Sequence, residues 1–171
     1  MCASLDDTSS RDIYLVDVDT GALTPFQSTR YHETGPVFSP NGRFLAYTTA
    51  FSATESTLRE VFVADVPEGS MKRQVSNGGA SAPQWSPDGR TLYYRAGGSI
   101  LAVEMDPDAG VPVSAPRPVW RGVFGQTDPD LTDYAVAPDG RILLVEPSER
   151  GHAVEHLDVV LNWHNLLPAG R

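Results

Sequence analysis

The sequence lacks several features that define whole classes of protein. Its 171 residues include a single cysteine, Cys2, so no disulfide can form within the chain. No apolar run approaches the roughly 20 residues that a membrane helix needs, and the first residues lack the basic and apolar regions of an export signal. We therefore expect no membrane segment in this chain, and the compartment stays unknown.

Clustered positive charge is also missing. The formal net charge is −9, and the basic residues are scattered along the chain. An acidic surface repels a phosphate backbone, so we expect no nucleic-acid partner. The chain does contain 15 glycines, 14 prolines and 40% hydrophobic residues, a composition typical of an all-β protein with many turns.

A six-residue phrase occurs three times. Trp-Ser-Pro-Asp-Gly-Arg at 85–90 stands between two runs of strand-forming residues, and related phrases stand at 38–43 and 136–141. Their glycines, Gly42, Gly89 and Gly140, are 47 and 51 residues apart. A period of roughly 40–50 residues with four short strands per unit is typical of β-propeller blades. The sequence therefore predicts an all-β propeller of four-stranded antiparallel blades.

Each phrase predicts a tight β-hairpin. Asp-Gly and Asn-Gly tolerate the positive φ angles of a type I′ turn, so we expect that turn, with Gly89 at positive φ in its second position. The expected turn residues are Asn41, Gly42, Asp88, Gly89, Asp139 and Gly140.

The strand pattern also predicts the organisation of the chain. We expect a disordered segment over 1–11, a partial propeller over 12–167 and a tail over 168–171. The propeller divides into outer strands at 12–28, a blade at 33–76, a second at 80–123 and a last partial blade at 132–164, whose final strand is expected at 157–163. These make about three blades, half of a six-bladed ring.

Longer phrases resemble a known family. Residues 33–47, 60–63, 74–79 and 83–95 resemble the TolB-like, PD-repeat β-propellers. Val-Val-Leu-Asn-Trp at 159–163 is similar to the end of the propeller that lies C-terminal to many bacterial eukaryotic-like serine/threonine kinases. The sequence departs from the family pattern at Asn41, Ala137 and His164. The resemblance implies a non-catalytic module for sensing or binding, attached to a catalytic or envelope partner, and its members are often periplasmic or extracytoplasmic.

Catalytic and metal motifs are incomplete. Residues 79–83 approach a nucleophile elbow but lack its last glycine, and the kinase signatures are absent. The Asp-x-Asp-x-Gly phrases at 17–21 and 106–110 fit turns better than calcium loops. We therefore expect no catalytic residue, no metal and no cofactor. The alternative is the gating propeller of a prolyl oligopeptidase-type serine peptidase whose hydrolase domain is absent here.

Binding residues are expected in the loops before the inner strands, because these loops surround one mouth of a propeller channel. For any one of them, a solvated loop without a ligand is an equally good interpretation. The expected partner is a protein or a small molecule. The candidates are Arg30, His32, Glu33, Asn77, Ser81, Gln126, Asp128 and Asp133.

Three blades cannot close a ring, since propellers have roughly four to eight. The chain begins with two outer strands and ends with an inner pair, and these ends are complementary. We therefore expect the ring to be closed by the rest of a longer chain or by a second copy.

Overall fold

The computed structural model describes residues 2–5, 11–51, 59–124 and 132–145. These residues form strands and connections, and no helix able to span a membrane occurs among them. The first sheet contains β1 (Cys2–Leu5), β2 (Arg11–Val16) and β3 (Leu23–Gln27). The second contains β4 (His32–Phe38), β5 (Phe44–Ala50), β6 (Arg59–Asp65) and β7 (Arg73–Gln74).

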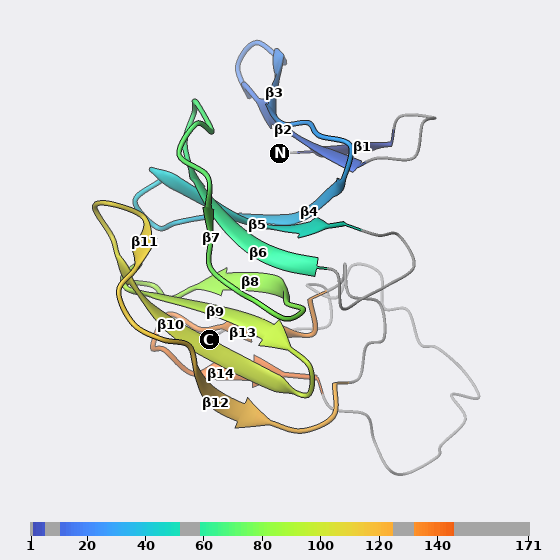
Figure 1. Ribbon diagram of the computed structural model, residues 1–171. Helices are drawn as coiled ribbons and strands as arrows, with labels where there is room; N and C mark the ends of the chain where they lie inside the picture. The colour runs from blue at the N-terminus through green and yellow to red at the C-terminus, as the bar shows by residue number, and fades with distance from the viewer. Residues whose placement is uncertain (1, 6–10, 52–58, 125–131, 146–171) are drawn as a thin grey trace, which may run out of the picture.

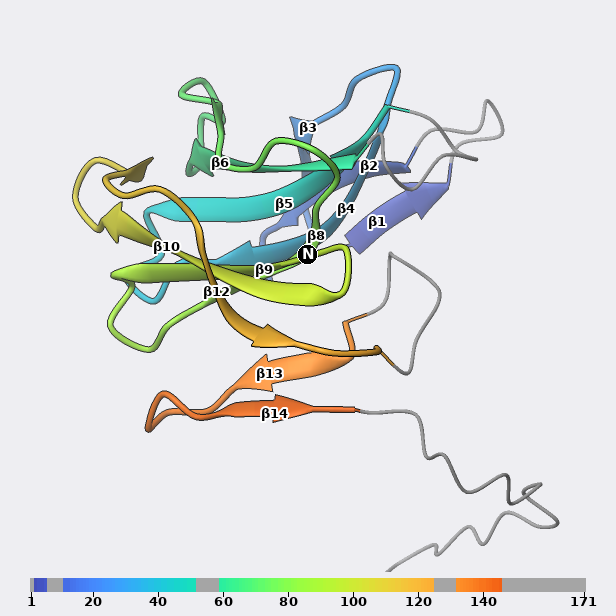
Figure 2. The same ribbon diagram turned by 60° about the horizontal axis from the view of Figure 1, so that its bottom comes forward.

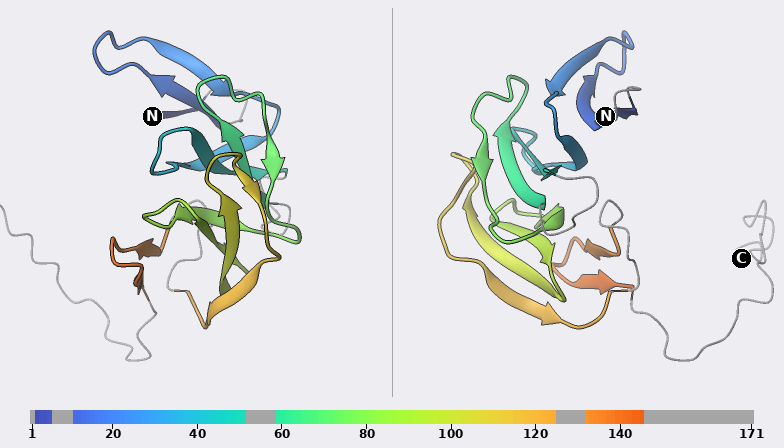
Figure 3. Two further views of the ribbon diagram at one scale, coloured as in Figure 1. Left: turned by 90° about the vertical axis from the view of Figure 1, so that its left-hand side faces the viewer. Right: turned by 45° about the vertical axis from the view of Figure 1, so that its right-hand side comes forward.

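The third sheet contains β8 (Ser81–Trp85), β9 (Thr91–Ala96), β10 (Ser99–Asp106), β11 (Val111–Pro112) and β12 (Arg117–Arg121). The fourth is a pair, β13 (Tyr134–Val136) and β14 (Ile142–Leu144). The four sheets follow one another in chain order: in Figure 1 β1–β3 lie at the top, β4–β7 lie below them, and the third and fourth sheets make up the lower half, and Figure 3 gives the same order from two other sides.

Every strand pair in these sheets is antiparallel. In the second sheet each strand pairs with the next one in the chain, in the order β4-β5-β6-β7. In the third sheet β10 pairs with β9 on one side and with β11 and β12 on the other. The β13–β14 pair contacts the third sheet through β13 and β8 and lies at the end of the row of sheets (Figure 2). The predicted all-β class and four-stranded antiparallel blade are confirmed.

The N-terminus differs from the expectation of disorder over residues 1–11. Cys2–Leu5 forms β1, which pairs with β2 from Cys2 opposite Tyr14 to Leu5 opposite Arg11. The pairing satisfies backbone groups along the free edge of β2, and Arg11 itself begins β2. The sequence did not indicate this strand because it has only four residues and a polar run, 6–11, follows it directly.

Three hydrophobic clusters fill the gaps between successive sheets. The first gap holds Ile13, Phe26, Leu45, Tyr47, Phe62 and Ala64. The second gap holds Phe44, Ala46, Val61, Val63, Val75, Ala80, Trp85, Leu92, Tyr94, Val103 and Met105. The third gap holds Ala82, Ile100 and Tyr134, with partly buried neighbours. Strand β5 shows how one sheet contributes to two clusters. Its alternate residues face opposite gaps, and all seven of its residues are buried.

Aromatic residues of the third sheet lie in these gaps. Trp85 is 7% exposed and Tyr94 is 2% exposed, and both pack in the second gap. The Trp85 indole Nε1 also donates a hydrogen bond of 3.3 Å to the carbonyl of Val37 in the neighbouring sheet. Tyr93 points the other way and packs against the third cluster.

The repeated phrase forms a type I turn, so the predicted type I′ turn is wrong. The Gly89 N–H donates to the Ser86 carbonyl at 2.9 Å, and equivalent bonds join Gly42 to Ser39 and Gly140 to Ala137. Gly89 has the predicted positive φ, +70°, but Ala82 is the one non-glycine residue with a positive φ in the described part of the chain, so Asp88 has none. A type I turn accepts proline after its first residue and glycine at its end, which is the order Ser-Pro-Asp-Gly.

Side-chain hydrogen bonds hold this turn. The Ser86 hydroxyl donates to Asp88 Oδ1 at 2.6 Å and accepts from the Thr91 N–H at 2.9 Å. Ser39 makes the same two bonds, with Asn41 Oδ1 and the Phe44 N–H. These bonds explain why serine and a short carboxylate or amide recur in the phrase.

We expect Ser86→Ala to lower the free energy of unfolding by about 1–2 kcal/mol, because two part-buried hydrogen bonds are lost, one from a backbone N–H and one to a carboxylate. Urea titration of the parent and the variant measures this difference. The third copy carries Ala137 in place of the serine, so Ala137→Ser is the reciprocal variant and should not destabilise the chain. Equal stability of Ser86→Ala and the parent would contradict this account of the turn.

Candidate binding site at the start of the inner strands

The inner strands of the second, third and fourth sheets are β4, β8 and β13. We call the ends at which these strands begin the inner-strand ends. The repeated turns close the opposite ends of the same strands. Six predicted site residues lie at or next to the inner-strand ends: Arg30, His32, Glu33, Asn77, Ser81 and Asp133. The other two, Gln126 and Asp128, lie outside the described residues.

The structure corrects the expectation that these six residues lie in open loops. His32 and Glu33 belong to β4, and Ser81 begins β8, because the inner strands extend further than the apolar pattern indicates. Glu33, Ser81 and Asp133 are buried, His32 is half-buried, and only Arg30 and Asn77 are exposed.

The exposed arginine is held by its neighbour. The Arg30 guanidinium lies 4.9 Å from the centre of the Tyr31 ring, and its Nη2 donates a 2.7 Å hydrogen bond to the Tyr31 hydroxyl. The Tyr31 ring in turn packs edge-on against Phe51, with ring centres 4.9 Å apart. These contacts present a fixed cation and two aromatic rings at the start of β4.

Glu60, which the sequence analysis missed, holds the Asn77 loop. Its Oε1 accepts from the N–H groups of Gly78 and Gly79 at 2.7 and 3.2 Å, and its Oε2 accepts from the Ser76 hydroxyl. Glu60 itself is only 9% exposed. A buried carboxylate that takes three hydrogen bonds fixes the loop that carries Asn77, so this loop is a rigid surface feature.

A second polar group gathers around Glu33, and we call it the Glu33 cluster: Asp12 on β2, Glu33 on β4, and Tyr47 and Thr49 on β5. Glu33 is opposite Thr49 in the β4–β5 register, and Tyr47 is two residues away on the same face. Burial raises the pKa of the Glu33 carboxyl, and the charge of Asp12 raises it further, while the Thr29 hydroxyl bond and the charge of Lys72 lower it. Burial and the charge of Glu33 also raise the pKa of Tyr47 above its ordinary value.

The raised pKa of Glu33 predicts a pH dependence of stability. Between the ordinary value of 4.5 and the raised value, the folded chain binds more protons at Glu33 than the unfolded chain does. The stabilisation from Glu33 is therefore full below pH 4.5 and is lost as the pH rises through the folded pKa. We expect Glu33→Gln to gain stability relative to the parent over this range, measured by urea titration in EDTA.

The exposed Glu104 offers a matched control for this pH dependence. Glu104→Gln makes the same chemical change at an exposed position, so the gain in stability of Glu33→Gln is measured relative to this variant as well as to the parent. The interpretation would be wrong if the difference in free energy of unfolding between Glu33→Gln and the parent stayed constant from about pH 4 to about pH 8.

An ion pair joins the third and fourth sheets. Arg95 on β9 contacts Asp133, just before β13, with Nη1 and Oδ2 3.2 Å apart, and their side chains are 10% and 3% exposed. The Tyr134 hydroxyl donates a 2.6 Å bond to the carbonyl of Ala82, and burial raises the pKa of Tyr134. The Phe124 ring covers the Arg95 guanidinium at 5.1 Å. Sequence reasoning identified Asp133 and missed Arg95, since nothing in the local pattern links positions 38 residues apart.

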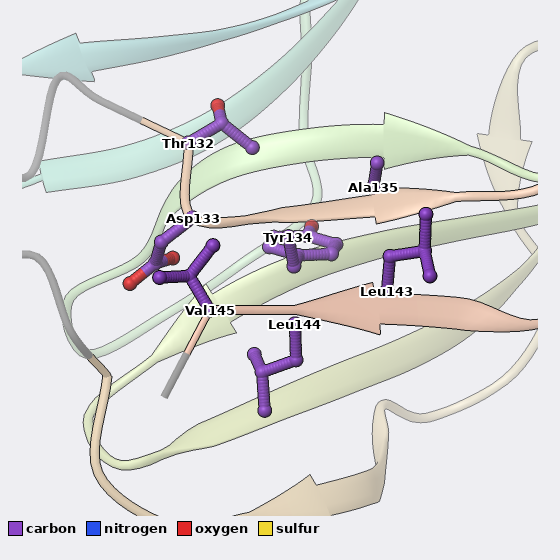
Figure 4. A pocket seen from close by; sticks show the side chains of 7 residues that line it. All are labelled: Thr132, Asp133, Tyr134, Ala135, Leu143, Leu144 and Val145. Atoms are coloured by element: carbon purple, nitrogen blue, oxygen red, sulfur yellow. The ribbon is translucent and has the colours of Figure 1, made fainter. Parts of the chain in front are cut away.

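A cavity of about 240 Å³ lies beside this pair, on the side of the β13–β14 sheet shown in Figure 4. Its lining combines the Asp133 carboxylate with apolar side chains, two of which, Leu143 and Val145, are 67% and 60% exposed. The lining residues are Thr132, Asp133, Tyr134, Ala135, Leu143, Leu144 and Val145. An apolar surface of this kind is typical of a sheet face that another element covers.

The two Asp-x-Asp-x-Gly phrases use their carboxylates within turns. Asp17 Oδ1 accepts from the N–H groups of Asp19 and Thr20, and Asp106 Oδ1 accepts from those of Asp108 and Ala109. Hydrogen bonds from Thr20 are the main cause of the lowered pKa of Asp17. Within the described ranges, no group of three or more His, Cys, Asp and Glu residues surrounds a common point.

Neither a protein-family model nor a curated protein matches the sequence. Solved structures do match the fold. TolB from Acinetobacter baumannii is similar over 82% of this chain and 33% of its own, with a TM-score of 0.57 and 20% identity. A putative TolB from Agrobacterium tumefaciens is similar over 77% of this chain and 48% of its own, with a TM-score of 0.55 and 21% identity.

A puromycin-hydrolysing peptidase from Mycobacterium tuberculosis is similar over 74% of this chain and 20% of its own, with a TM-score of 0.56 and 24% identity. The chain thus spans less than half the length of each of these three proteins. At these identities the likeness concerns the fold alone. The row of antiparallel sheets, the repeated turn and these matches together show that the chain has the fold of part of a TolB-like β-propeller.

Proposed function

We propose that the chain is part of a non-catalytic propeller module that binds a protein or a small-molecule ligand at the inner-strand ends. One observation carries the proposal: polar side chains gather at these ends in three successive sheets, around Glu33, Asn77 and Asp133. Loops and strand ends that a rigid sheet holds in place are the usual location of binding residues. Arg30 and Asn77 offer the exposed contacts, and the buried residues behind them supply the rigidity.

The test is a thermal-shift screen of the full chain against free amino acids, nucleotides, sugars and short peptides. A ligand at about one hundred times its Kd should stabilise the folded chain by about 2.7 kcal/mol. We expect Arg30→Ala or Asn77→Ala to remove the shift. Arg90→Ala is the matched control, because this exposed arginine lies in the turn at the opposite end of the third sheet. The proposal fails if no probe binds, or if both variants bind like the parent.

We further propose that the module belongs to a larger sensor protein of the kinase-associated or envelope type. The support is the similarity of residues 159–163 to the closing segment of kinase-associated propellers. A second candidate is the gating propeller of a serine peptidase, which the likeness to the mycobacterial peptidase favours. The complete reading frame separates the two: a kinase or envelope domain upstream supports the sensor, and a G-x-S-x-G hydrolase domain downstream supports the peptidase.

We also propose how the propeller ring is completed. We propose that the rest of a longer chain or a second copy covers the open faces of the first and fourth sheets. Leu23 on β3 and Leu143 on β14 are 62% and 67% exposed. Val18 in the β2–β3 turn and Val145 directly after β14 are 91% and 60% exposed. We expect light scattering on the isolated 171-residue chain to detect dimers or larger species. A stable, monodisperse monomer would contradict this prediction.

A further inference from the structure

The Glu33 cluster contains four buried oxygen atoms without a hydrogen-bond partner. They are Asp12 Oδ1, Glu33 Oε2, Tyr47 OH and Thr49 Oγ1. Glu33, Tyr47 and Thr49 are 0% exposed. Buried polar atoms in native proteins almost always have a partner, and leaving one without costs about 1–3 kcal/mol. Four in one group indicate that something else occupies the gap between the first and second sheets.

The carboxylates of Asp12 and Glu33 each have one oxygen that a hydroxyl group holds and one oxygen without a partner. Two consecutive residues of the β3–β4 connection each hold one oxygen: the Ser28 hydroxyl donates to Asp12 Oδ2 at 3.0 Å, and the Thr29 hydroxyl donates to Glu33 Oε1 at 2.6 Å. The remaining oxygen of each carboxylate is the unpartnered one. Hydroxyl groups that fix one oxygen of a ligating carboxylate and leave the other free are typical of support around a metal site.

The charge of the cluster favours a cation over a water molecule. The charge of the half-buried Asp12 acts on the buried Glu33, so two carboxylates act on the same region. The cation whose charge acts on Glu33 is Lys72, and its Nζ lies over the rings of Phe62 and Tyr47, at 4.3 and 5.4 Å from their centres. Among the described residues, the ion pairs within 4.0 Å are Arg43–Asp108, Arg95–Asp133 and Arg141–Asp139, so Lys72 pairs with neither carboxylate. Water would satisfy the hydrogen bonds but would not offset the charge.

We propose that the Glu33 cluster binds a calcium ion. All four free atoms are hard oxygen donors from carboxylate, phenol and hydroxyl groups, which Ca²⁺ accepts in flexible geometry. Zinc prefers nitrogen and sulfur ligands, and magnesium demands near-ideal octahedral geometry. With two carboxylates and the opposing charge of Lys72, we expect a weak site, with a Kd of about 0.1–1 mM.

The experiment uses the full chain, treated with EDTA and then dialysed, at constant ionic strength. Calorimetric titration with CaCl₂ should give one site in the expected range, and MgCl₂ should bind at least about tenfold more weakly. Terbium, used as a calcium substitute, should show luminescence sensitised by the aromatic rings, and Tyr47→Phe should reduce this signal. Thermal melts should rise with CaCl₂.

Glu33→Gln is the decisive variant, since it keeps the shape of the side chain and removes the charge. We expect its calcium Kd to rise at least about tenfold. Glu104→Gln, at an exposed position on β10, should bind calcium like the parent. If Glu33→Gln does not fold, Thr49→Ala and Tyr47→Phe provide the same test, each with a several-fold rise in Kd. The proposal is overturned if the parent does not bind at about 10 mM CaCl₂, or if all three variants bind like the parent.

Discussion

Arg95→Met should destabilise the folded chain by about 3–5 kcal/mol, because it leaves the Asp133 carboxylate buried without its partner. Methionine keeps most of the volume and apolar length of the arginine stem, so the loss reports on the charge. The packing of Phe124 over the guanidinium adds to it. Urea titration, with the β13–β14 sheet monitored separately by hydrogen exchange, measures the effect.

Arg43→Met is the matched control for this prediction. It breaks the Arg43–Asp108 pair, whose side chains are 55% and 87% exposed, and exposed pairs contribute about 0–1 kcal/mol. The double variant Arg95→Met/Asp133→Leu should recover much of the loss, since an apolar pair can replace a buried ion pair without a penalty. A double variant less stable than Arg95→Met alone would contradict the ion-pair interpretation.

Gly110→Ala should cost about 2–5 kcal/mol, the sum of a backbone and a packing effect. Gly110 has φ +64°, and a Cβ atom there would lie 2.5 Å from the Phe44 ring on β5. Phe44 is 5% exposed and belongs to the cluster between the second and third sheets, so it has little room to move. Thermal or urea unfolding of the purified variant measures the cost.

Gly97→Ala separates the two effects. Gly97 also has a positive φ, +54°, but a Cβ atom there would meet nothing within 4 Å. Its expected cost is therefore the left-handed conformation alone, about 1–2 kcal/mol. If the two alanine variants were equally stable, the contact between the β10–β11 turn and Phe44 would not be as tight as described.

Much of the fold could be predicted from the sequence because it depends on local patterns. The spacing of Gly42, Gly89 and Gly140 predicted the repeat. The turn type was missed although the local information was present: Pro87 has a φ fixed near −65°, which suits a type I turn.

The candidate site was predicted only in part. Sequence position placed Glu33 and Asp133 near the inner-strand ends, but it gave no sign that both are buried. Burial there depends on which sheet packs against which, and that information lies in residues far along the chain, such as Arg95 for Asp133. Glu60 was missed for the same reason, because the loop that it holds begins 17 residues later.

The arrangement of three separate clusters between four sheets has a consequence for how the chain unfolds. Most of the packing in the described part of the chain joins adjacent sheets, so its stability approximates a sum of sheet terms and nearest-neighbour interface terms, as in a linear array. The first or the fourth sheet can then detach with the loss of one interface between sheets, whereas the second and third sheets each form two such interfaces. The chain therefore behaves as a row of coupled cooperative units in which β5 and β9 open last and β13 and β14 open early.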